Sequence, residues 1–322
     1  MMRKRSDDML GFDIGGTKCA VSVGENADGV LTISDKRVMP TDLSVSPYEM
    51  LDRLIGAARE MTNDFSKMGI SCGGPLDAAR GVILSPPNLP GWDEVEVVSY
   101  LEKCLGGKAY LCNDADACAL AEWQYGAGRG SHTMAFLTFG TGLGSGLILG
   151  DRLWQGSHGL AGEIGHIRLA PRGPVGYHKK GSFEGFCSGG GIRQLGQMAA
   201  REVLARGEIL PYCKNEEELD GINARVLADY ARKGEPVAMD IFKTVGRRLG
   251  SGLAILADVI DPEVIVIGSV FARCEELIRP HMEPVFLREA LVGDRCRIVP
   301  AALGEQIGDY AALTVAQMEE WI

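Results

Sequence analysis

Two glycine-rich turns, one in each half of the chain, restrict the folds this sequence can adopt. Gly15-Gly16-Thr17 lies between apolar residues 10–14 and 19–23, and Gly140-Thr141-Gly142-Leu143-Gly144 lies between residues 134–138 and 147–149. Short apolar runs joined by glycine-rich turns are typical of β-hairpins. Residues without a Cβ also let a ligand approach backbone N–H groups closely. The sequence therefore predicts two hairpins, each suited to contact a ligand.

Strand and helix patterns alternate along the rest of the chain. Strand patterns cover residues 30–33, 109–111 and 264–267, and helical spacing covers residues 48–61, 114–123, 192–204, 222–232, 236–260, 274–287 and 309–320. Such alternation predicts an α/β fold, and 322 residues suggest two lobes. We expect an N-terminal α/β lobe at residues 1–115 and a C-terminal α/β lobe at 116–305. Residues 306–322 are expected to pack on the first lobe, with a shared central cleft between the lobes.

Charge and composition exclude some classes of protein. The formal net charge is -10, which argues against nucleic acid as a partner because phosphate backbones are bound by clustered Lys and Arg. No apolar stretch is long enough for a signal peptide or a membrane span, so we expect a cytoplasmic protein without a membrane partner. None of the nine cysteines forms a C-x-x-C pair, and free thiols are expected.

The two glycine-rich turns differ from the common nucleotide-binding motifs. Residues 11–18 nearly match a P-loop, but Thr17 stands where lysine should follow Gly16. The second turn lacks the G-x-G-x-x-G spacing of dinucleotide-binding proteins. An ordinary tight hairpin would explain the first turn by itself. Two such turns together favour opposing clamps on one nucleotide.

Four motifs occur in an order that resembles a known family. They are Asp13 to Lys18, Asn113 to Ala117, Gly159 to His166 and Asp261 to Gly268. Together they resemble the ROK family of sugar kinases and sugar-responsive repressors, from Leu10 to about Thr314. The resemblance implies the two-lobed actin-like ATPase fold (ribonuclease H-like) with ATP between the lobes. It also implies a homodimer that phosphorylates a hydroxyl of a hexose or N-acetylhexosamine, using ATP and Mg²⁺.

Two aspartates are the candidates for the reaction itself. Phosphorylation of a sugar hydroxyl needs a nearby base, and we expect Asp114 to be that catalytic residue. The alternative is that Asp114 caps the following helix. Asp13 is expected to orient Mg²⁺ through water, since Mg²⁺ keeps much of its hydration. Its alternative is a hydrogen bond to its own turn.

The resemblance assigns further residues to the sugar and to the nucleotide. The expected substrate-binding residues are Gly74, Asn88, Asn113, Asp114, Glu163, His166 and Glu184. The expected ATP- and phosphate-binding residues are Asp13, Gly15, Gly16, Thr17, Lys18, Thr141, Gly142 and Gly268. A turn residue is the alternative for Asn113, and an ordinary surface charge for Glu184. Ser269 and Val270 interrupt the glycine run that follows Gly268 in the family.

The zinc motif of the family is altered. The pattern C-x-C-G-x-x-G-C-x-E falls on residues 175–184, where Val175, Tyr177 and Ser182 replace its three cysteines. Valine and tyrosine are poor replacements for the thiolates of a structural zinc site. We therefore expect this segment to bind no zinc.

Two other functions remain open from the sequence. A sugar-responsive regulator would carry a helix-turn-helix before the first turn, for which Asp13 leaves no room in this sequence. A non-catalytic sugar sensor is disfavoured by Asp13, Thr17, Asn113 and Asp114. Glucose, N-acetylmannosamine, another N-acetylhexosamine, mannose, fructose and allose all remain candidate substrates.

Overall fold

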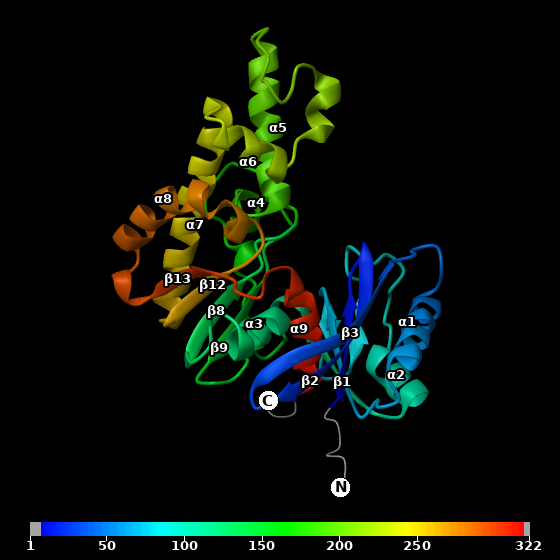
Figure 1. Cartoon of the computed structure of the whole chain (residues 1–322). Helices are drawn as coiled ribbons and strands as arrows, with labels where there is room; N and C mark the ends of the chain where they lie inside the picture. The colour runs from blue at the N-terminus through cyan, green and yellow to red at the C-terminus, as the bar shows by residue number, and fades with distance from the viewer. Residues whose placement is uncertain (1–7, 319–322) are drawn as a thin grey trace. The chain divides into compact units, whose positions relative to one another are not determined.

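The computed structural model describes residues 8–318 and divides into two compact units. Unit 1 contains the chain up to Phe136, residues Gly146–Ala161 and the segment from Ala302 onward. Unit 2 contains Leu137–Ser145 and Gly162–Ala301. The chain therefore passes between the units more than once, at the second glycine-rich turn and again near Ala302 (Figure 1).

Unit 1 is built on a five-stranded mixed sheet of order β3-β2-β1-β4-β7. Its strands are β1 Asp8–Ile14, β2 Lys18–Ala27, β3 Val30–Pro40, β4 Lys67–Cys72 and β7 Lys108–Asn113. The first three form antiparallel hairpins, which confirms the strand–turn–strand prediction at Gly15-Gly16-Thr17. Strands β1, β4 and β7 run parallel, so their carboxyl ends lie at one edge of the sheet.

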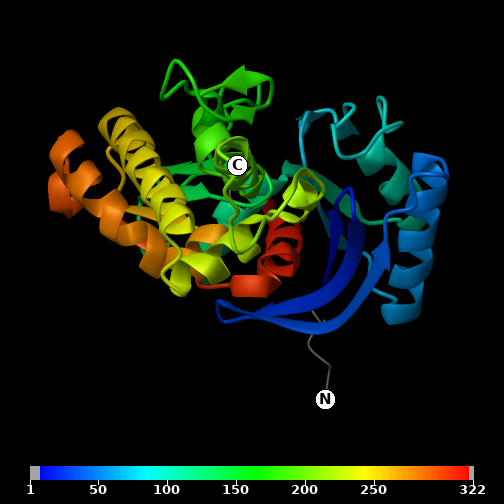
Figure 2. The same ribbon diagram turned by 90° about the horizontal axis from the view of Figure 1, so that it is seen from above.

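Helices cover both faces of this sheet (Figures 1 and 2). They are α1 Pro47–Met61, α2 Val97–Leu105, α3 Asp114–Tyr125 and α9 Ile307–Val315. Leu10, Phe12 and Ile14 point to the face that packs on α1 and α2, as strand alternation requires. A Cβ added to Gly11 or Gly69 would lie within 3 Å of α9 atoms. Glycine at these positions therefore lets α9 pack directly on the other face.

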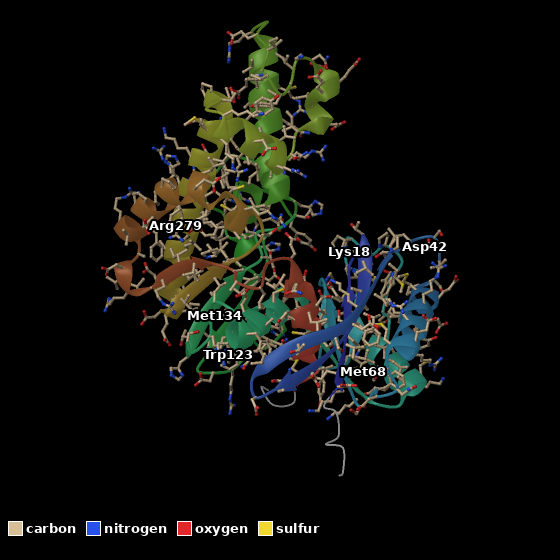
Figure 3. The ribbon with its side chains drawn as sticks, viewed as in Figure 1. Lys18, Asp42, Met68, Trp123, Met134 and Arg279 are labelled. Atoms are coloured by element: carbon tan, nitrogen blue, oxygen red, sulfur yellow. The ribbon has the colours of Figure 1, made fainter. Side chains whose placement is uncertain are left out.

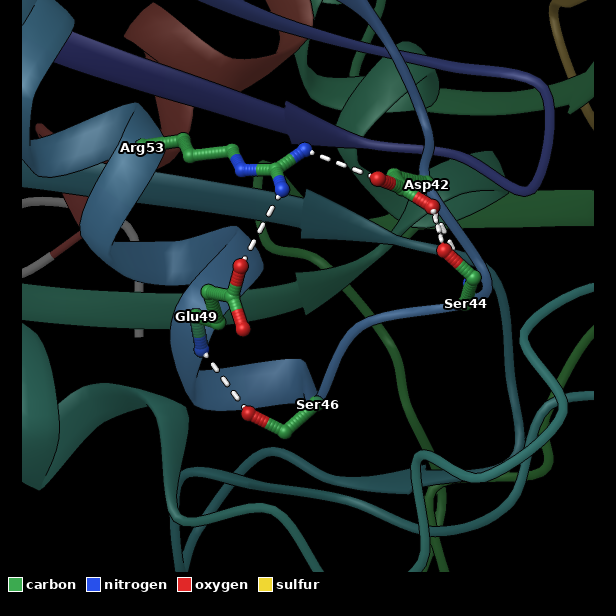
Figure 4. Close-up of polar contacts among 5 residues, drawn as sticks. All are labelled: Asp42, Ser44, Ser46, Glu49 and Arg53. Carbon is green, nitrogen blue, oxygen red and sulfur yellow. Dashed lines mark hydrogen bonds and ion pairs between the residues drawn. The ribbon is translucent and has the colours of Figure 1, made fainter.

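Polar side chains fix the start of α1 (Figure 4). Ser46 caps the helix by accepting the Glu49 N–H at 3.2 Å. Arg53 donates to Asp42 at 3.0 Å and to Glu49 at 3.1 Å, while the Ser44 hydroxyl donates to Asp42 at 2.6 Å. These contacts hold the connection between β3 and α1. Because they are exposed, these ion pairs add little to the stability of the unit.

Unit 2 is mainly helical. Its longer helices are α5 Gly189–Ala205, α6 Ala224–Arg232, α7 Pro236–Ile260 and α8 Val270–Glu289. A second sheet has four strands in the order β13-β12-β8-β9. The parallel strands β12 Val264–Ile267 and β13 Arg297–Pro300 belong to unit 2, whereas most residues of β8 Thr133–Leu137 and β9 Ser145–Leu149 belong to unit 1. The strand predicted at residues 264–267 and the helix predicted at 236–260 have the same bounds in the structure. The helix predicted at 274–287 begins earlier, at Val270, and contains a kink at Cys274.

Short elements complete both units. Unit 1 contains the hairpin of β5 Leu76–Asp77 and β6 Val82–Ile83. Unit 2 contains the hairpin of β10 Val175–Gly176 and β11 Lys179–Lys180, the 3₁₀ turn Ile164–His166 and the short helix α4 Phe183–Phe186. The helix predicted at residues 309–320 runs from Ile307 to Val315, and residues 319 and 320 lie outside the described residues.

Candidate functional site

The candidate residues of unit 1 gather at the carboxyl ends of its three parallel strands. In the register of the sheet, Asp13 pairs with Ser71 and Cys72 pairs with Asn113. Figure 3 shows Lys18 at the end of the sheet opposite to Met68, which lies near the start of β4. In α/β sheets, the carboxyl ends of parallel strands are the common location of ligand sites. The sheet therefore places Asp13, Asn113 and Lys18 at the same edge.

The first glycine-rich turn is held in a fixed shape. Thr41 donates its hydroxyl to the Gly15 carbonyl at 2.5 Å and its N–H to the Thr17 carbonyl at 3.1 Å. A Cβ added to Gly16 would lie 2.1 Å from the Asn88 carbonyl oxygen. Only glycine fits at this position, and the turn consequently lies directly against Asn88.

Asn88, Asn113 and Asp114 surround the turn at Gly73 and Gly74. A Cβ built on Gly73 would lie 3.7 Å from the side-chain amide of Asn88 and 3.9 Å from Asp114 Oδ2. A Cβ built on Gly74 would lie 3.2 Å from Asn113 Nδ2. These two glycines lie close to one carboxylate and two amides. Such a group of donors and acceptors is suited to hydroxyl groups of a ligand.

The helix cap at the start of α3 falls on Asn113 and not on Asp114. Asn113 accepts the Ala115 N–H at 3.0 Å with its side-chain oxygen. Asp114 is the first residue of the helix, and its Oδ1 accepts the same N–H at 2.9 Å. The alternative that Asp114 serves as the N-cap is therefore wrong. Asp114 is exposed, so its second oxygen can be reached by a ligand.

The carboxyl groups of Asp13 and Asp114 both have raised pKa values. Burial raises the pKa of Asp13 to about 6, and the charges of Asp114 and Asp309 add to the rise, while Lys18 and Lys36 oppose it. Atoms packed around Asp114 also raise the pKa of that carboxyl, against hydrogen bonds from the backbone N–H groups of Ala115 and Asp114 itself. A site where neighbouring charges and burial disfavour ionised carboxylates is stabilised by a bound cation.

Asp309 is a residue of this site that the sequence analysis missed. Its carboxylate accepts the Ser22 hydroxyl at 2.7 Å and Lys36 Nζ at 2.5 Å. Gly308, at the start of α9, lies against Asp13, because an added Cβ would be 2.8 Å from Asp13 Oδ2. No local motif marks Asp309. Its only signal in the sequence is an aspartate in the first turn of a predicted helix.

The second glycine-rich turn, in unit 2, is anchored by the beginning of α5. Gly189 donates its N–H to the Gly140 carbonyl at 2.7 Å, and Gly190 donates to the Thr141 carbonyl at 3.1 Å. Glu184 lies on the same turn, since its Oε2 accepts the Leu143 N–H at 3.0 Å. The structure therefore brings Glu184 together with Thr141 and Gly142. Sequence reasoning missed Gly189 and Gly190, for which the three consecutive glycines at 189–191 were the available signal.

Glu163 and His166 lie beside the β10–β11 hairpin. His166 Nε2 is 3.7 Å from Glu163 Oε2, and the edge of the His166 ring contacts the Tyr177 ring with 4.9 Å between centroids. Lys179 Nζ donates to the His166 carbonyl at 2.7 Å. Ser182 accepts the Gly185 N–H at 3.0 Å and so begins α4, which carries Glu184. Two of the three positions of the missing cysteines are thus occupied by a tyrosine that contacts His166 and a serine that caps α4.

Gly268 follows β12 and lies close to the second turn. Its N–H donates to the Leu137 carbonyl at 2.9 Å, and the Val270 N–H donates to the Phe139 carbonyl at 3.0 Å. Ser269 has a positive φ of 50°. Gly268 therefore lies with the second turn in unit 2, whereas the candidate residues of the first turn lie in unit 1.

The described part of the chain, residues 8–318, contains no metal-binding cluster of side chains and no membrane-spanning helix. Within this part of the chain, no three His, Cys, Asp or Glu side chains are arranged to hold a metal ion. No helix there combines the length and apolar character needed to cross a membrane.

Similarity to known proteins identifies the fold class and the family of this chain. This chain is similar to the crystal structure of a ROK family glucokinase from Streptomyces griseus in complex with glucose and AMPPNP. The match covers 97% of this chain and 99% of that chain, with a TM-score of 0.76 and 30% sequence identity. The protein accordingly has the actin-like α/β fold of the hexokinases. The ROK family model matches residues 9–319, and the chain belongs to the ROK family.

Two curated relatives are named as sugar kinases. A glucokinase of Streptomyces coelicolor is 31% identical over 310 residues, which are 95% of each chain. An N-acetylmannosamine kinase of Escherichia coli is 33% identical over 261 residues, which are 80% of this chain and 81% of the relative. The family predicted from the four ordered motifs is thereby confirmed.

Proposed function

We propose that this protein transfers the γ-phosphoryl group of ATP to a hydroxyl of a hexose or N-acetylhexosamine. The observation that carries the proposal is the position of Asp114, with a raised pKa, beside Asn88 and Asn113 at the Gly73-Gly74 turn. A base and two amides gathered at one turn suit a sugar hydroxyl that must be oriented and deprotonated. The relatives named glucokinase and N-acetylmannosamine kinase make glucose and N-acetylmannosamine the first sugars to test.

Asp114 is the proposed general base. Its Oδ1 is held by the Ala115 N–H, so the carboxylate has a fixed orientation, and Oδ2 faces the turn. A raised pKa makes the carboxylate a stronger proton acceptor. Asn88, Asn113 and Gly74 would then contact the sugar from unit 1.

The other assignments follow the packing within each unit. Gly15, Gly16, Thr17 and Lys18 form the proposed phosphate turn of unit 1, and Thr141 and Gly142 form that of unit 2 near Gly268. Glu163, His166 and Glu184 are the proposed sugar contacts of unit 2. Glu184 would also fix the shape of the second turn through its hydrogen bond with Leu143.

Mg²⁺ and ATP are the proposed cofactors, and the residues present fit the metal. Asp13 lies among Asp114 and Asp309 with a pKa raised to about 6, so a cation there would relieve repulsion. Mg²⁺ needs only one or two protein carboxylates because water and phosphates complete its octahedral coordination. Bound Mg²⁺ would supply charge neutralisation of the polyphosphate. Asp13 would orient the ion through water.

A coupled assay of ADP release tests the activity. The purified protein would be given MgATP with glucose, N-acetylmannosamine, N-acetylglucosamine, mannose, fructose and allose in turn. We expect one or a few sugars to raise ADP release well above the sugar-free rate. If calorimetry shows sugar binding but no sugar raises ADP release, the protein is a non-catalytic sugar sensor.

The quaternary structure and cellular location are proposed as well. We propose a homodimer, as the family resemblance implies, in the cytoplasm, where ATP and hexoses are available. The formal net charge of -10 keeps the nucleic-acid alternative disfavoured.

A further inference from the structure

Basic residues of α7 and α8 line a hollow in unit 2. The hollow has a volume of about 450 Å³ and is lined by Thr244, Arg247, Arg248, Ser251, Val285 and Arg288. The four α7 residues follow a spacing of three, four and seven positions, so they share one face of that helix. Val285 and Arg288 are three positions apart on α8. The hollow is thus bordered by one stripe from each helix.

Two glycines bring these stripes together. Figures 1 and 2 show α7 and α8 side by side. A Cβ added to Gly246 would lie 2.6 Å from the Ile278 carbonyl oxygen, and one added to Gly250 would lie 2.4 Å from the Met282 carbonyl oxygen. The helix backbones therefore approach more closely than larger residues would permit. This close packing holds the arginines of both helices at one site.

The positive charges of the arginines in the hollow are only partly neutralised by neighbouring groups. Arg248 lies over the Phe186 ring, with 4.9 Å from its guanidinium carbon to the ring centroid, and Arg288 donates to Glu289 at 2.8 and 3.0 Å. Within residues 8–318, Arg247 forms no ion pair with a carboxylate. Burial lowers the pKa of nearby His281, and the charges of Lys243 and Arg247 lower it further. The positive charge is concentrated here although the whole chain carries a formal net charge of -10.

We propose that this hollow is a second anion site that binds the phosphoryl groups of a small oligophosphate or phosphorylated metabolite. Arginine offers a planar fork of N–H donors that matches phosphoryl oxygens in pairs. The hydroxyl of Thr244 adds a neutral donor on the same face, while the Ser251 hydroxyl donates to the Arg247 carbonyl at 3.2 Å. The volume of about 450 Å³ accommodates a ligand of several phosphate or sugar units. This site is formed within unit 2 and does not depend on the function proposed above.

Titration calorimetry with inorganic pyrophosphate tests the site, at constant ionic strength and without Mg²⁺. The double variant Arg247→Gln/Arg288→Gln removes two guanidinium groups and leaves Arg248 on Phe186. We expect this variant to bind pyrophosphate at least about tenfold more weakly at this site than the wild type, since charge-assisted hydrogen bonds are lost. Arg201→Gln/Arg225→Gln removes the same charge from exposed positions on α5 and α6 and should bind as the wild type does.

Two further measurements make the result decisive. Glucose 6-phosphate is titrated in place of pyrophosphate to distinguish a phosphorylated sugar from an oligophosphate. The compound that binds with the higher affinity identifies the class of ligand that the site prefers. Nitrogen-15 spectra should show the Arg247 and Arg288 side-chain signals shifting with the ligand. Equal pyrophosphate affinity in wild type and double variant, or no binding to either, would overturn the proposal. The arginines would then form only a solvated basic surface.

Discussion

At the scale of single residues, the carboxyl groups of Asp13 and Asp114 determine the chemistry that unit 1 can support. Both have raised pKa values, and the charge of Asp114 contributes to that of Asp13. Asn113 provides the helix cap, which leaves Asp114 available to a ligand. Asp309 adds a third carboxylate, held by Ser22 and Lys36. We use Asp114→Asn to test the effect on turnover and Asp13→Asn to test the effect on the stability of the metal-free protein.

Asp114→Asn should lower kcat by about 10²-fold or more without lowering the melting temperature. Asparagine preserves the size of the side chain and removes the proton acceptor, and the cap at Asn113 is unaffected. Steady-state kinetics with the best sugar and saturating MgATP measure the effect, with calorimetric sugar affinity as the control. Full activity of the variant would sink the catalytic assignment.

Asp13→Asn should stabilise the metal-free protein at pH 8. The pKa of Asp13 is raised from 3.8 to about 6, so the folded state prefers the neutral carboxyl and ionisation destabilises it. This cost is absent below pH 3.8, grows through the interval up to about pH 6 and is complete above it. A shift of this size corresponds to about 3 kcal/mol.

Urea unfolding of wild type and Asp13→Asn at pH 8 and pH 5 measures this difference. The variant should be more stable at pH 8, and its advantage should shrink at pH 5. Asp294→Asn, which removes an exposed carboxylate, should show neither effect. An advantage that is equal at both pH values would contradict the assigned cause.

At the scale of secondary structure elements, the β10–β11 hairpin shows how a segment is fixed by hydrogen bonds. The Gln194 side chain on α5 accepts the Val175 N–H at 2.9 Å and donates to the Val175 carbonyl at 2.8 Å. Lys179 binds the His166 carbonyl from the other strand. These contacts hold β10 to α5 and β11 to the segment that carries His166.

Gln194→Leu should loosen this hairpin. Both Val175 bonds are lost, but water can replace them in part because the site is exposed, so we expect a loss of about 0.5–1.5 kcal/mol. Limited trypsin digestion should cut faster after Lys179 or Lys180. Arg201→Gln on the same helix serves as the control for cleavage elsewhere. Chelator treatment of the wild type should leave the digestion unchanged, whereas faster cutting after chelation would indicate a structural metal.

At the scale of the whole molecule, an exposed apolar surface on α7 and α8 is consistent with the proposed homodimer. Ile255 and Val259 lie four residues apart on α7, and Leu287 and Leu291 lie four residues apart at the end of α8 and just beyond it. Val259 is 75% exposed and Leu291 is 88% exposed. The Leu291 N–H donates to Asp258 at 2.8 Å, which places both pairs on neighbouring surfaces. Exposed apolar groups of this kind often mark protein interfaces.

Val259→Glu/Leu291→Glu should convert the dimer into a monomer. Light scattering coupled to gel filtration should give the wild type about twice the 34.5 kDa mass of one chain and the variant the mass of one chain. Two carboxylates would be buried without partners in such an interface, which strongly opposes association. Met198→Glu, at an exposed position on α5, should remain a dimer. A wild type that is monomeric at all concentrations would exclude the homodimer.

The sequence by itself determined the local elements and the family. Apolar periodicity and turn residues act over a few positions, which is why α7 and β12 have their predicted bounds and both glycine-rich turns follow strands. Only the tertiary structure decided which distant groups meet. Asp309 lies near Asp13 because Gly11 and Gly69 admit α9 to the sheet, and Glu184 joins the second turn through a bond to Leu143. These contacts depend on packing between segments far apart in the chain, and no local pattern encodes them.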